Sequence, residues 1–211
     1  MAVKPMIFSG PMVKAILDGD KTMTRRVIKP QPKCRLYYAY AAGRKRDIGK
    51  WLYPSQYAME RDGINPPPEG FIAADRDALW TPPCHGDDIL WVRETWAQRN
   101  GQILYLTEDT LTRCLTDDGE AIKWRPSIHM PRYAARIFLR VTKVSVERLQ
   151  EISVEDIARE ALAGLVPTSN FTFRRFWDSL RKPPDLKRYG WEANPWVWVI
   201  SFRRCEKPEA W

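Results

Sequence analysis

The sequence has few cysteines, and they lack the spacing that is typical of metal sites. Its four cysteines stand at positions 34, 84, 114 and 205, and no two of them form a C-x-x-C pair. A zinc site built from Cys34, Cys84, His85 and Cys114 is an alternative that their spacing does not support. Reduced, unpaired thiols explain these residues more simply, so we expect neither a metal nor another cofactor.

Long apolar runs, a secretory signal and internal repeats are also missing. The apolar stretches fall short of the ~20 residues that a membrane-spanning helix needs. Residues 1–10 lack the apolar region of a signal peptide. We therefore expect a cytoplasmic protein without a membrane partner. With 211 residues, of which 44% are hydrophobic, the chain is long enough for one domain with a sizeable core.

Positive charge is in excess. The chain has 34 Lys and Arg against 26 Asp and Glu, which gives a net charge of +8 and a pI near 9.4. This balance favours an anionic partner, with nucleic acid as the first candidate. The ten Trp residues could fill a core or stack on bases. Trp196 and Trp198 lie in an apolar run, which favours the core for these two.

Segment 15–29 is the part of the sequence richest in side chains that could bind a ligand or take part in catalysis. An apolar helical pattern that starts near Pro11 ends at Gly19, a common helix stop. The extended run that follows is rich in basic and hydroxyl side chains. An ordinary solvated edge strand, whose charges discourage further pairing, is the structural alternative to a functional strand.

In a strand, successive side chains point to opposite faces, so the run after Gly19 would present two different sets of groups. One face is expected to carry Thr22, Thr24 and Arg26, and the other Lys21, Met23 and Arg25. A tight turn before Thr22 could swing Lys21 round towards Thr24.

Strand and helix patterns are scattered along the rest of the chain. Strands at 89–96 and 102–106 are predicted to form a hairpin around an Asn100-Gly101 turn. Further strands are predicted at 135–144 and 195–202, and helices at 149–165 and 172–180. This order predicts an α+β fold in which a small mixed sheet closes into a barrel, with two or three helices outside it.

Residues 30–83 differ in composition from the rest. They mix Pro, Gly and basic residues with several aromatics, which indicates an insertion folded back on the body. We expect a single domain over residues 1–205 that carries this insertion, followed by a tail at 206–211. His129 lies in a Pro-bounded loop and is expected to be structural, because no second His or Cys is spaced to complete a dyad.

The segment 16–26 resembles the opening motif of the ASCH domain, a relative of the PUA fold. The matching positions are Ile16, Leu17, Gly19, Lys21, Thr22, Thr24 and Arg26. The segment 86–92 is similar to the family's second motif, a Gly-Asp turn that leads into a barrel strand. The whole chain also resembles the longer, prophage-type members, which carry an insertion between these two motifs.

This resemblance implies a PUA-like (ASCH) mixed β-barrel with a cleft beside the first motif that binds RNA or a nucleoside. Some small bacterial members are amidohydrolases that remove the acetyl group from N4-acetylcytidine. They use a Lys and a Thr three positions apart in the first motif, and a Glu in the helix after the central strand. Lys21 and Thr24 match the first two, and Glu160 matches the third by its place in the helix. The resemblance therefore implies that these three residues are catalytic.

The chemistry of amide hydrolysis suits these residue types. It needs a nucleophile, a base and a proton donor. Thr24 could be the nucleophile, and Lys21 the base if burial or positive neighbours lower its pKa. Glu160 could protonate the leaving amine or orient a water. Two alternatives stay open: a plain Lys21–Glu160 ion pair on the wall of a binding cleft without turnover, and a ribonuclease that uses the same two groups.

The expected ligand is a nucleoside or a segment of single-stranded RNA. Arginine can hold phosphates or base edges, and aromatic side chains can stack on bases. The candidate binding residues are Thr22, Arg25, Arg26, Trp91, Arg93 and Trp96.

Overall fold

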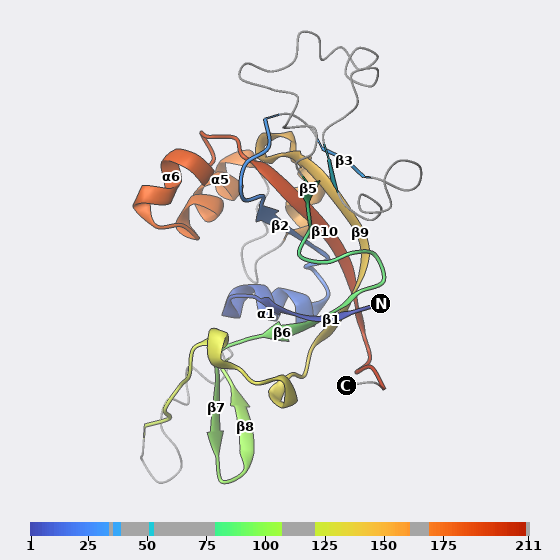
Figure 1. The fold of residues 1–211 in the computed structure, drawn as a ribbon. Coiled ribbons are helices and arrows are strands. Elements are labelled where there is room, and N and C mark those ends of the chain that lie inside the picture. The colour runs from blue at the N-terminus through green and yellow to red at the C-terminus, as the bar shows by residue number, and fades with distance from the viewer. Residues whose placement is uncertain (34–35, 39–50, 53–78, 107–120, 161–168, 210–211) are drawn as a thin grey trace.

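The computed structural model describes residues 1–33, 36–38, 51–52, 79–106, 121–160 and 169–209 (Figure 1). Most of the predicted insertion therefore lies outside the described residues, as do Cys34 and Cys114. Three two-residue strands within or beside it pair antiparallel in chain order: β3 (Tyr37–Tyr38), β4 (Trp51–Leu52) and β5 (Leu79–Trp80). The division into one domain with an insertion stays a prediction.

Five strands form the main sheet. Their order is β1 (Val3–Ile7), β6 (Ile89–Arg93), β9 (Phe138–Arg148), β10 (Trp196–Cys205) and β2 (Met23–Val27). β1 runs parallel to β6, and the other neighbouring pairs are antiparallel. β9 and β10 are the longest strands and curve through the middle of the molecule (Figure 1). The predicted mixed α+β class is confirmed.

The sheet is open, which corrects the predicted closed barrel. Among the described residues, no backbone hydrogen bond joins the edge strands β1 and β2. A side chain spans the gap instead, since Nη2 of Arg26 on β2 donates to the carbonyl of Ile7 at the end of β1 over 2.6 Å. Pro5 in β1 lacks an N–H for a further strand.

Four α-helices lie in the described residues, against the two or three that the sequence predicts. They are α1 (Gly10–Asp18), α4 (Val154–Arg159), α5 (Asn170–Ser179) and α6 (Pro183–Tyr189). The sequence suggests a loop around Pro183 and Pro184, but proline is well suited to the first helical turn, so α6 begins there. None of the helices described is long and apolar enough to span a membrane.

The helix predicted at 149–165 is shorter and is interrupted. A 3-10 turn covers Leu149–Glu151, and α4 begins after Ser153, whose hydroxyl accepts a hydrogen bond from the Asp156 amide at 3.2 Å. α4 ends at Arg159, with Glu160 as the residue that closes it. The remainder of the prediction, residues 161–165, lies outside the described part of the chain.

The hairpin predicted around Asn100 and Gly101 is confirmed. It consists of β7 (Trp96–Arg99) and β8 (Gln102–Tyr105), with positive φ at both turn residues, 48° and 78°. This is the backbone that a two-residue type I′ turn needs. The preceding strand is divided, since β6 ends at Arg93 and β7 starts a separate, two-stranded sheet.

β10 joins two hydrophobic cores. Trp196, Trp198 and Ile200 point into the core shared with α1, while Val197 and Val199 point into the core under α4 and α5. The predicted burial of the two tryptophans is confirmed, and the strand is apolar on both faces. β2 lies beside β10 at the sheet edge, in register Thr24 with Ile200, so this double core holds the edge strand in place.

Candidate functional site

The turn between α1 and β2 is fastened at several points. Gly19 closes α1 with φ 90°, a left-handed conformation that glycine adopts without strain. The Lys21 amide then donates to the Ala15 carbonyl at 3.0 Å, and the Thr22 amide to the Arg159 carbonyl at 3.0 Å. These bonds join the start of β2 to the ends of α1 and α4, and they fix the direction in which the Lys21 side chain leaves the backbone.

Lys21 and Glu160 form a buried ion pair. The Lys21 ammonium lies 3.0 Å from Oε2 of Glu160 and donates to the Glu160 backbone carbonyl at the same distance. The Lys21 side chain is fully buried, and that of Glu160 is 4% exposed. Burial lowers the pKa of Lys21, although the Glu160 carboxylate opposes this, and the nearby Arg26 and Arg25 lower it further. The structure therefore brings two of the three predicted catalytic residues into direct contact.

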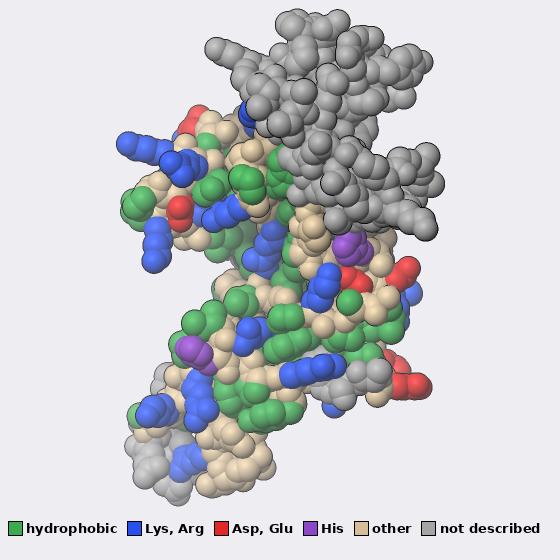
Figure 2. Space-filling view, viewed as in Figure 1, with side chains coloured by type: hydrophobic (Ala, Val, Ile, Leu, Met, Phe, Trp, Pro, Cys, Tyr) green, Lys and Arg blue, Asp and Glu red, His purple; other side chains and the backbone are tan. Residues whose placement is uncertain are grey.

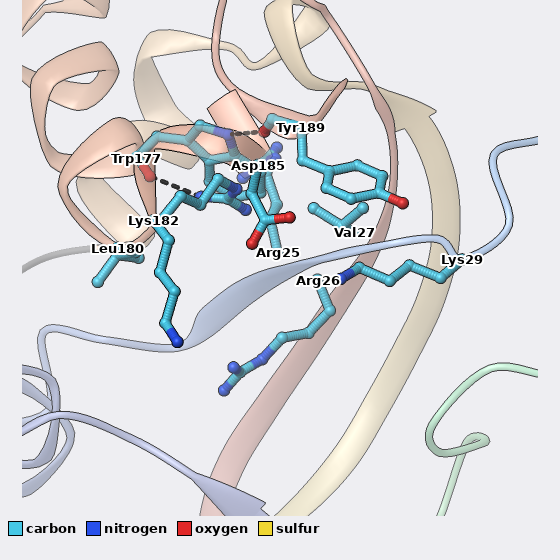
Figure 3. A pocket seen from close by; sticks show the side chains of 10 residues that line it. Arg25, Arg26, Val27, Lys29, Trp177, Leu180, Lys182, Asp185 and Tyr189 are labelled. Atoms are coloured by element: carbon cyan, nitrogen blue, oxygen red, sulfur yellow. Dashed lines mark hydrogen bonds between the residues drawn. The ribbon is translucent and has the colours of Figure 1, made fainter. Parts of the chain in front are cut away.

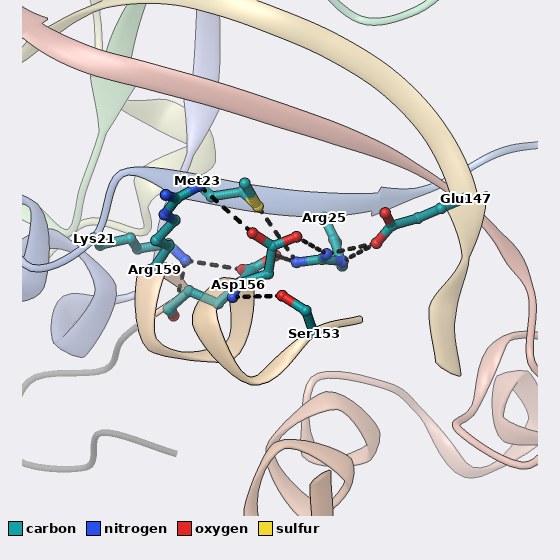
Figure 4. Close-up of polar contacts among 8 residues, drawn as sticks. Lys21, Met23, Arg25, Glu147, Ser153, Asp156 and Arg159 are labelled. Atoms are coloured by element: carbon teal, nitrogen blue, oxygen red, sulfur yellow. Dashed lines mark hydrogen bonds and ion pairs between the residues drawn. The ribbon is translucent and has the colours of Figure 1, made fainter. Parts of the chain in front are cut away.

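Arg25 supports this pair from the same face of β2 (Figure 4). Its guanidinium contacts three carboxylates: Glu160 at 3.2 Å, Asp156 at 3.0 Å and Glu147 at 2.5 Å. Burial works against the charged form, but Glu160 and Glu147 outweigh it and raise the pKa of Arg25. A buried guanidinium with its donors directed to carboxylates acts as structural support, so we expect it to hold Glu160 rather than to meet a ligand.

Thr24 points to the other face of β2. It is buried, with 2% of its surface exposed, and the alternation along the strand places it on the side of Arg26 rather than that of Arg25. In the described part of the chain, no hydrogen bond joins the Thr24 hydroxyl to Lys21 or Glu160. Of the three residues predicted as catalytic, Lys21 and Glu160 are thus bonded to each other, whereas Thr24 stands apart from them. Thr22, before the strand, is exposed.

A first cavity, the edge cavity, lies between the two sheet edges and has a volume of about 500 Å³. Its lining residues are Pro5, Met6, Ile7, Arg26, Val27, Lys29, Thr81, Pro83, Arg93 and Trp198. Arg26 is held by the Ile7 carbonyl and lies over the Phe8 ring at 5.3 Å. Arg93 is held by the carbonyls of Ile128 and, at 3.0 Å, Met130.

Both arginines line the edge cavity and touch no carboxylate among the described residues. Among the described residues their only hydrogen-bond partners are backbone carbonyls, and neither forms an ion pair with a carboxylate. The Nε atoms of both are buried and without a hydrogen-bond partner there. Guanidiniums that are fixed in place and line a cavity are suited to an incoming anion.

A second cavity, the helical cavity, lies between β2 and the helices α5 and α6 and has a volume of about 450 Å³ (Figure 3). Its lining residues are Arg25, Arg26, Val27, Lys29, Trp177, Leu180, Arg181, Lys182, Asp185 and Tyr189. The Lys29 ammonium lies 4.5 Å from the centre of the Tyr189 ring, and the Arg181 guanidinium 3.6 Å from that of Trp177. Burial lowers the pKa of Arg181 to about 10.

The two cavities share Arg26, Val27 and Lys29, so together they form one groove across the edge strand, here called the β2 groove. Figure 2 shows the molecular surface hollowed between the end with α5 and α6 and the end with the β7–β8 hairpin, with Lys and Arg side chains along the hollow. Within the described residues, Lys29 and Lys182 form no ion pair either. The groove therefore concentrates positive charge, and Asp185 is the one acidic residue among the described residues that line it.

The predicted aromatic contacts, Trp91 and Trp96, lie elsewhere. Both are buried in small hydrophobic clusters, at 7% and 2% exposure, and neither lines the β2 groove. The groove's own aromatic and basic residues beyond β2, such as Arg181 and Tyr189, were not found from the sequence. Their only signal is a basic, aromatic composition near α6, and no local pattern places α6 beside β2.

Metal-binding side chains do not cluster in the described residues, where no group of three or more His, Cys, Asp or Glu could hold a metal ion. Cys84 is buried, and burial raises the pKa of its thiol to about 12, so it stays protonated. The alternative zinc site that also includes Cys34 and Cys114 lies partly outside the described residues.

Comparison with known proteins gives one weak likeness. No protein-family model matches the chain, and no curated protein matches it. The crystal structure of an ASCH domain from Lactobacillus crispatus JV V101 aligns with 96% of this chain and 79% of that chain, with a TM-score of 0.35 and 10% sequence identity. A likeness at this level carries no argument about function, so the ASCH resemblance rests on the motifs in segments 16–26 and 86–92.

Proposed function

We propose that this protein binds single-stranded RNA in the β2 groove. The observation that carries the proposal is the set of cationic side chains, centred on Arg26 and Lys29, that meet at the shared wall of two cavities without a carboxylate partner in the described residues. Phosphates are the anions that a row of such groups suits best. The resemblance of segment 16–26 to the ASCH motif supports RNA as the ligand.

Single strands suit this groove better than a duplex. The arginines in the edge cavity are fixed by backbone carbonyls, and the partly exposed ring of Tyr189 lies within the same groove. Flat rings beside fixed cations bind unstacked bases together with their phosphates. A double helix would offer its phosphates but keep its bases stacked out of reach.

The test is the fluorescence anisotropy of a short, labelled oligocytidylate with the wild type and with Arg26→Ala and Lys29→Ala. Each variant should bind roughly tenfold more weakly, because it removes a charged contact at the centre of the groove. Arg174→Ala is the matched control, because Arg174 is half exposed, pairs with Glu192 and does not line the groove. A wild type that does not bind, or an equal loss in the control, would contradict the proposal.

A second candidate, deacylation of N4-acetylcytidine, is favoured by the Lys21–Glu160 pair. The buried Lys21, with a lowered pKa, could take the proton of the Thr24 hydroxyl as its oxygen attacks the acetyl carbon. The resulting ammonium would protonate the exocyclic nitrogen as the C–N bond breaks. Water would then hydrolyse the acetyl ester on Thr24 and release acetate.

In this mechanism Glu160 is a positioning residue. Its carboxylate contacts Nζ of Lys21 at 3.0 Å and the Arg25 guanidinium at 3.2 Å, so it fixes the place of the Lys21 side chain beside β2. The mechanism requires the Thr24 hydroxyl, which points to the other face of β2, to come within hydrogen-bond reach of Lys21 when substrate binds, so the start of β2 must rearrange.

One assay separates this activity from its rivals. The protein is incubated with N4-acetylcytidine and with a short RNA, and cytidine release and RNA length are followed together. Thr24→Val, which keeps the shape but removes the hydroxyl, should lower deacylation by roughly a hundredfold or more, while Thr24→Ser should retain most of it. Shortened RNA would indicate a ribonuclease instead. If no cytidine is released and the RNA keeps its length, both enzymatic functions are excluded and the RNA-binding proposal stands alone.

A further inference from the structure

The β2 groove has two compartments of similar size. The edge cavity and the helical cavity measure about 500 and 450 Å³, and each is within the range of pockets that enclose a small molecule. Arg26 and Lys29 belong to both linings, so they form the wall between the compartments. A ligand that fills only one compartment would leave the cations of the other without a counter-charge.

The helical cavity offers a flat surface for a base. Tyr189 is partly exposed, and its ring already accepts the Lys29 ammonium over its face. Trp177 is buried and is covered by Arg181, whose Nη1 donates to the Trp177 carbonyl at 2.5 Å. The planar guanidinium of Arg181 therefore lies fixed against a ring, and Arg181 is one of the residues that line the cavity. Rings and stacked guanidiniums of this kind accept bases on their faces.

The edge cavity offers a different surface. Its apolar lining includes Met6, Pro83 and Trp198, and its polar groups are the two arginines held by carbonyls, Arg26 and Arg93. Both keep a buried Nε without a partner among the described residues. An apolar floor beside two fixed guanidiniums can take a nucleotide whose phosphate or base edge meets the guanidinium groups that line the cavity.

We infer that the β2 groove binds two consecutive nucleotides, one in each cavity, with the phosphate that links them on Arg26 and Lys29. The inference rests on the proposed function and deepens it, because it identifies the ligand as an oligonucleotide rather than a free nucleoside. A nucleoside is uncharged and would leave the cations of both compartments unneutralised. A linked pair places a phosphate at the shared wall and a base on each side.

The test compares ligands of increasing length by calorimetry: cytidine, cytidine 5′-monophosphate, the dinucleotide pCpC and a longer oligocytidylate. The dinucleotide should bind at least tenfold more tightly than the mononucleotide, with little further gain per added nucleotide. Tyr189→Ala and Arg93→Ala should each weaken the dinucleotide roughly tenfold and change the mononucleotide about twofold or less, because one compartment remains. Arg174→Ala should change neither.

A second kind of variant, which fills the edge cavity instead of removing a side chain from its wall, guards against loss of binding through misfolding. Thr81 is exposed and lines the edge cavity, so Thr81→Trp fills that cavity without disturbing the core. It should reduce dinucleotide affinity to that of the mononucleotide. Equal affinities of wild type for the mononucleotide and the dinucleotide would overturn the two-compartment inference while RNA binding stands. No binding of the long oligonucleotide would overturn the proposed function as well.

Discussion

The two members of the buried Lys21–Glu160 ion pair differ in how many charged partners they have. Among the described residues, Lys21 has one carboxylate partner, Glu160, whereas Glu160 contacts two cations, Lys21 and Arg25. A buried charge that loses its only partner is far more costly than one that keeps a second. The two members of this ion pair should therefore respond differently to substitution.

Glu160→Gln should lower the free energy of unfolding by about 3 to 5 kcal/mol, because it leaves the Lys21 ammonium buried without a counter-charge. Lys21→Met should cost less, about 1 to 3 kcal/mol, since Arg25 still neutralises Glu160. Urea unfolding measures both. Glu192→Gln is the control: Glu192 pairs with Arg174 at 71% exposure, and its loss should cost no more than about 1 kcal/mol. A larger loss in Lys21→Met than in Glu160→Gln would contradict this reasoning.

Stability should also depend on pH through Lys21. Burial lowers its pKa in the folded protein, so between that lowered value and about 10.4 the unfolded chain binds more protons than the folded one. The contribution of Lys21 to the free energy of unfolding is therefore lowest below this pH range, and it increases as the pH rises through the range. Glu160→Gln removes the opposing carboxylate, so its unfolding free energy should rise more between about pH 7 and pH 10 than that of Glu192→Gln. A flat or falling difference would contradict the lowered pKa.

The sequence could indicate some of this site and not the rest. Lys21, Thr24 and Glu160 were expected together from the family motif, and the contact between Lys21 and Glu160 is present. The support of Arg25 by Glu147 could not be foreseen, because that carboxylate comes from β9, far along the chain. Alternation along a strand indicates a face, but it does not identify the partner on the neighbouring element.

At the scale of elements, the turn after α1 decides where β2 starts. Gly19 has φ 90° and no atom within 4 Å of the position that a Cβ would occupy, so only backbone conformation restricts this site. Gly19→Ala should therefore lower the free energy of unfolding by about 1 kcal/mol. Gly86→Ala is the matched control, because Gly86 is equally open and its φ is not in the left-handed region. Equal effects of the two substitutions would show that the left-handed turn is not the cause.

Local signals predicted elements well where the deciding contacts were local. The Asn100-Gly101 hairpin and the end of α1 at Gly19 follow from turn and cap chemistry within a few residues. The open sheet was missed because closure depends on whether β1 and β2 reach each other, which is set by three intervening strands. Strand alternation contains no information on that distance.

At the scale of the whole molecule, the chain carries a net charge of +8, and the β2 groove, where we propose that RNA binds, is lined by several Lys and Arg side chains. RNA affinity should fall steeply with added salt, with a slope of roughly −0.7 per phosphate contacted in a plot of log affinity against log salt. Anisotropy titrations at several salt concentrations measure the slope. Lys29→Ala should make it shallower by about one contact, whereas Arg174→Ala should leave it unchanged. A salt-independent affinity would exclude phosphate contacts.

The pairing of β2 with β10 has a consequence for synthesis. β2 is made early, at residues 23–27, but its only neighbour in the main sheet of the described residues is β10, at residues 196–205. Until β10 emerges from the ribosome, β2 has no strand to join and the second core lacks Val197 and Val199. The β2 groove can therefore form only after residues 196–205 have been made, and a folding delay follows from the strand order itself.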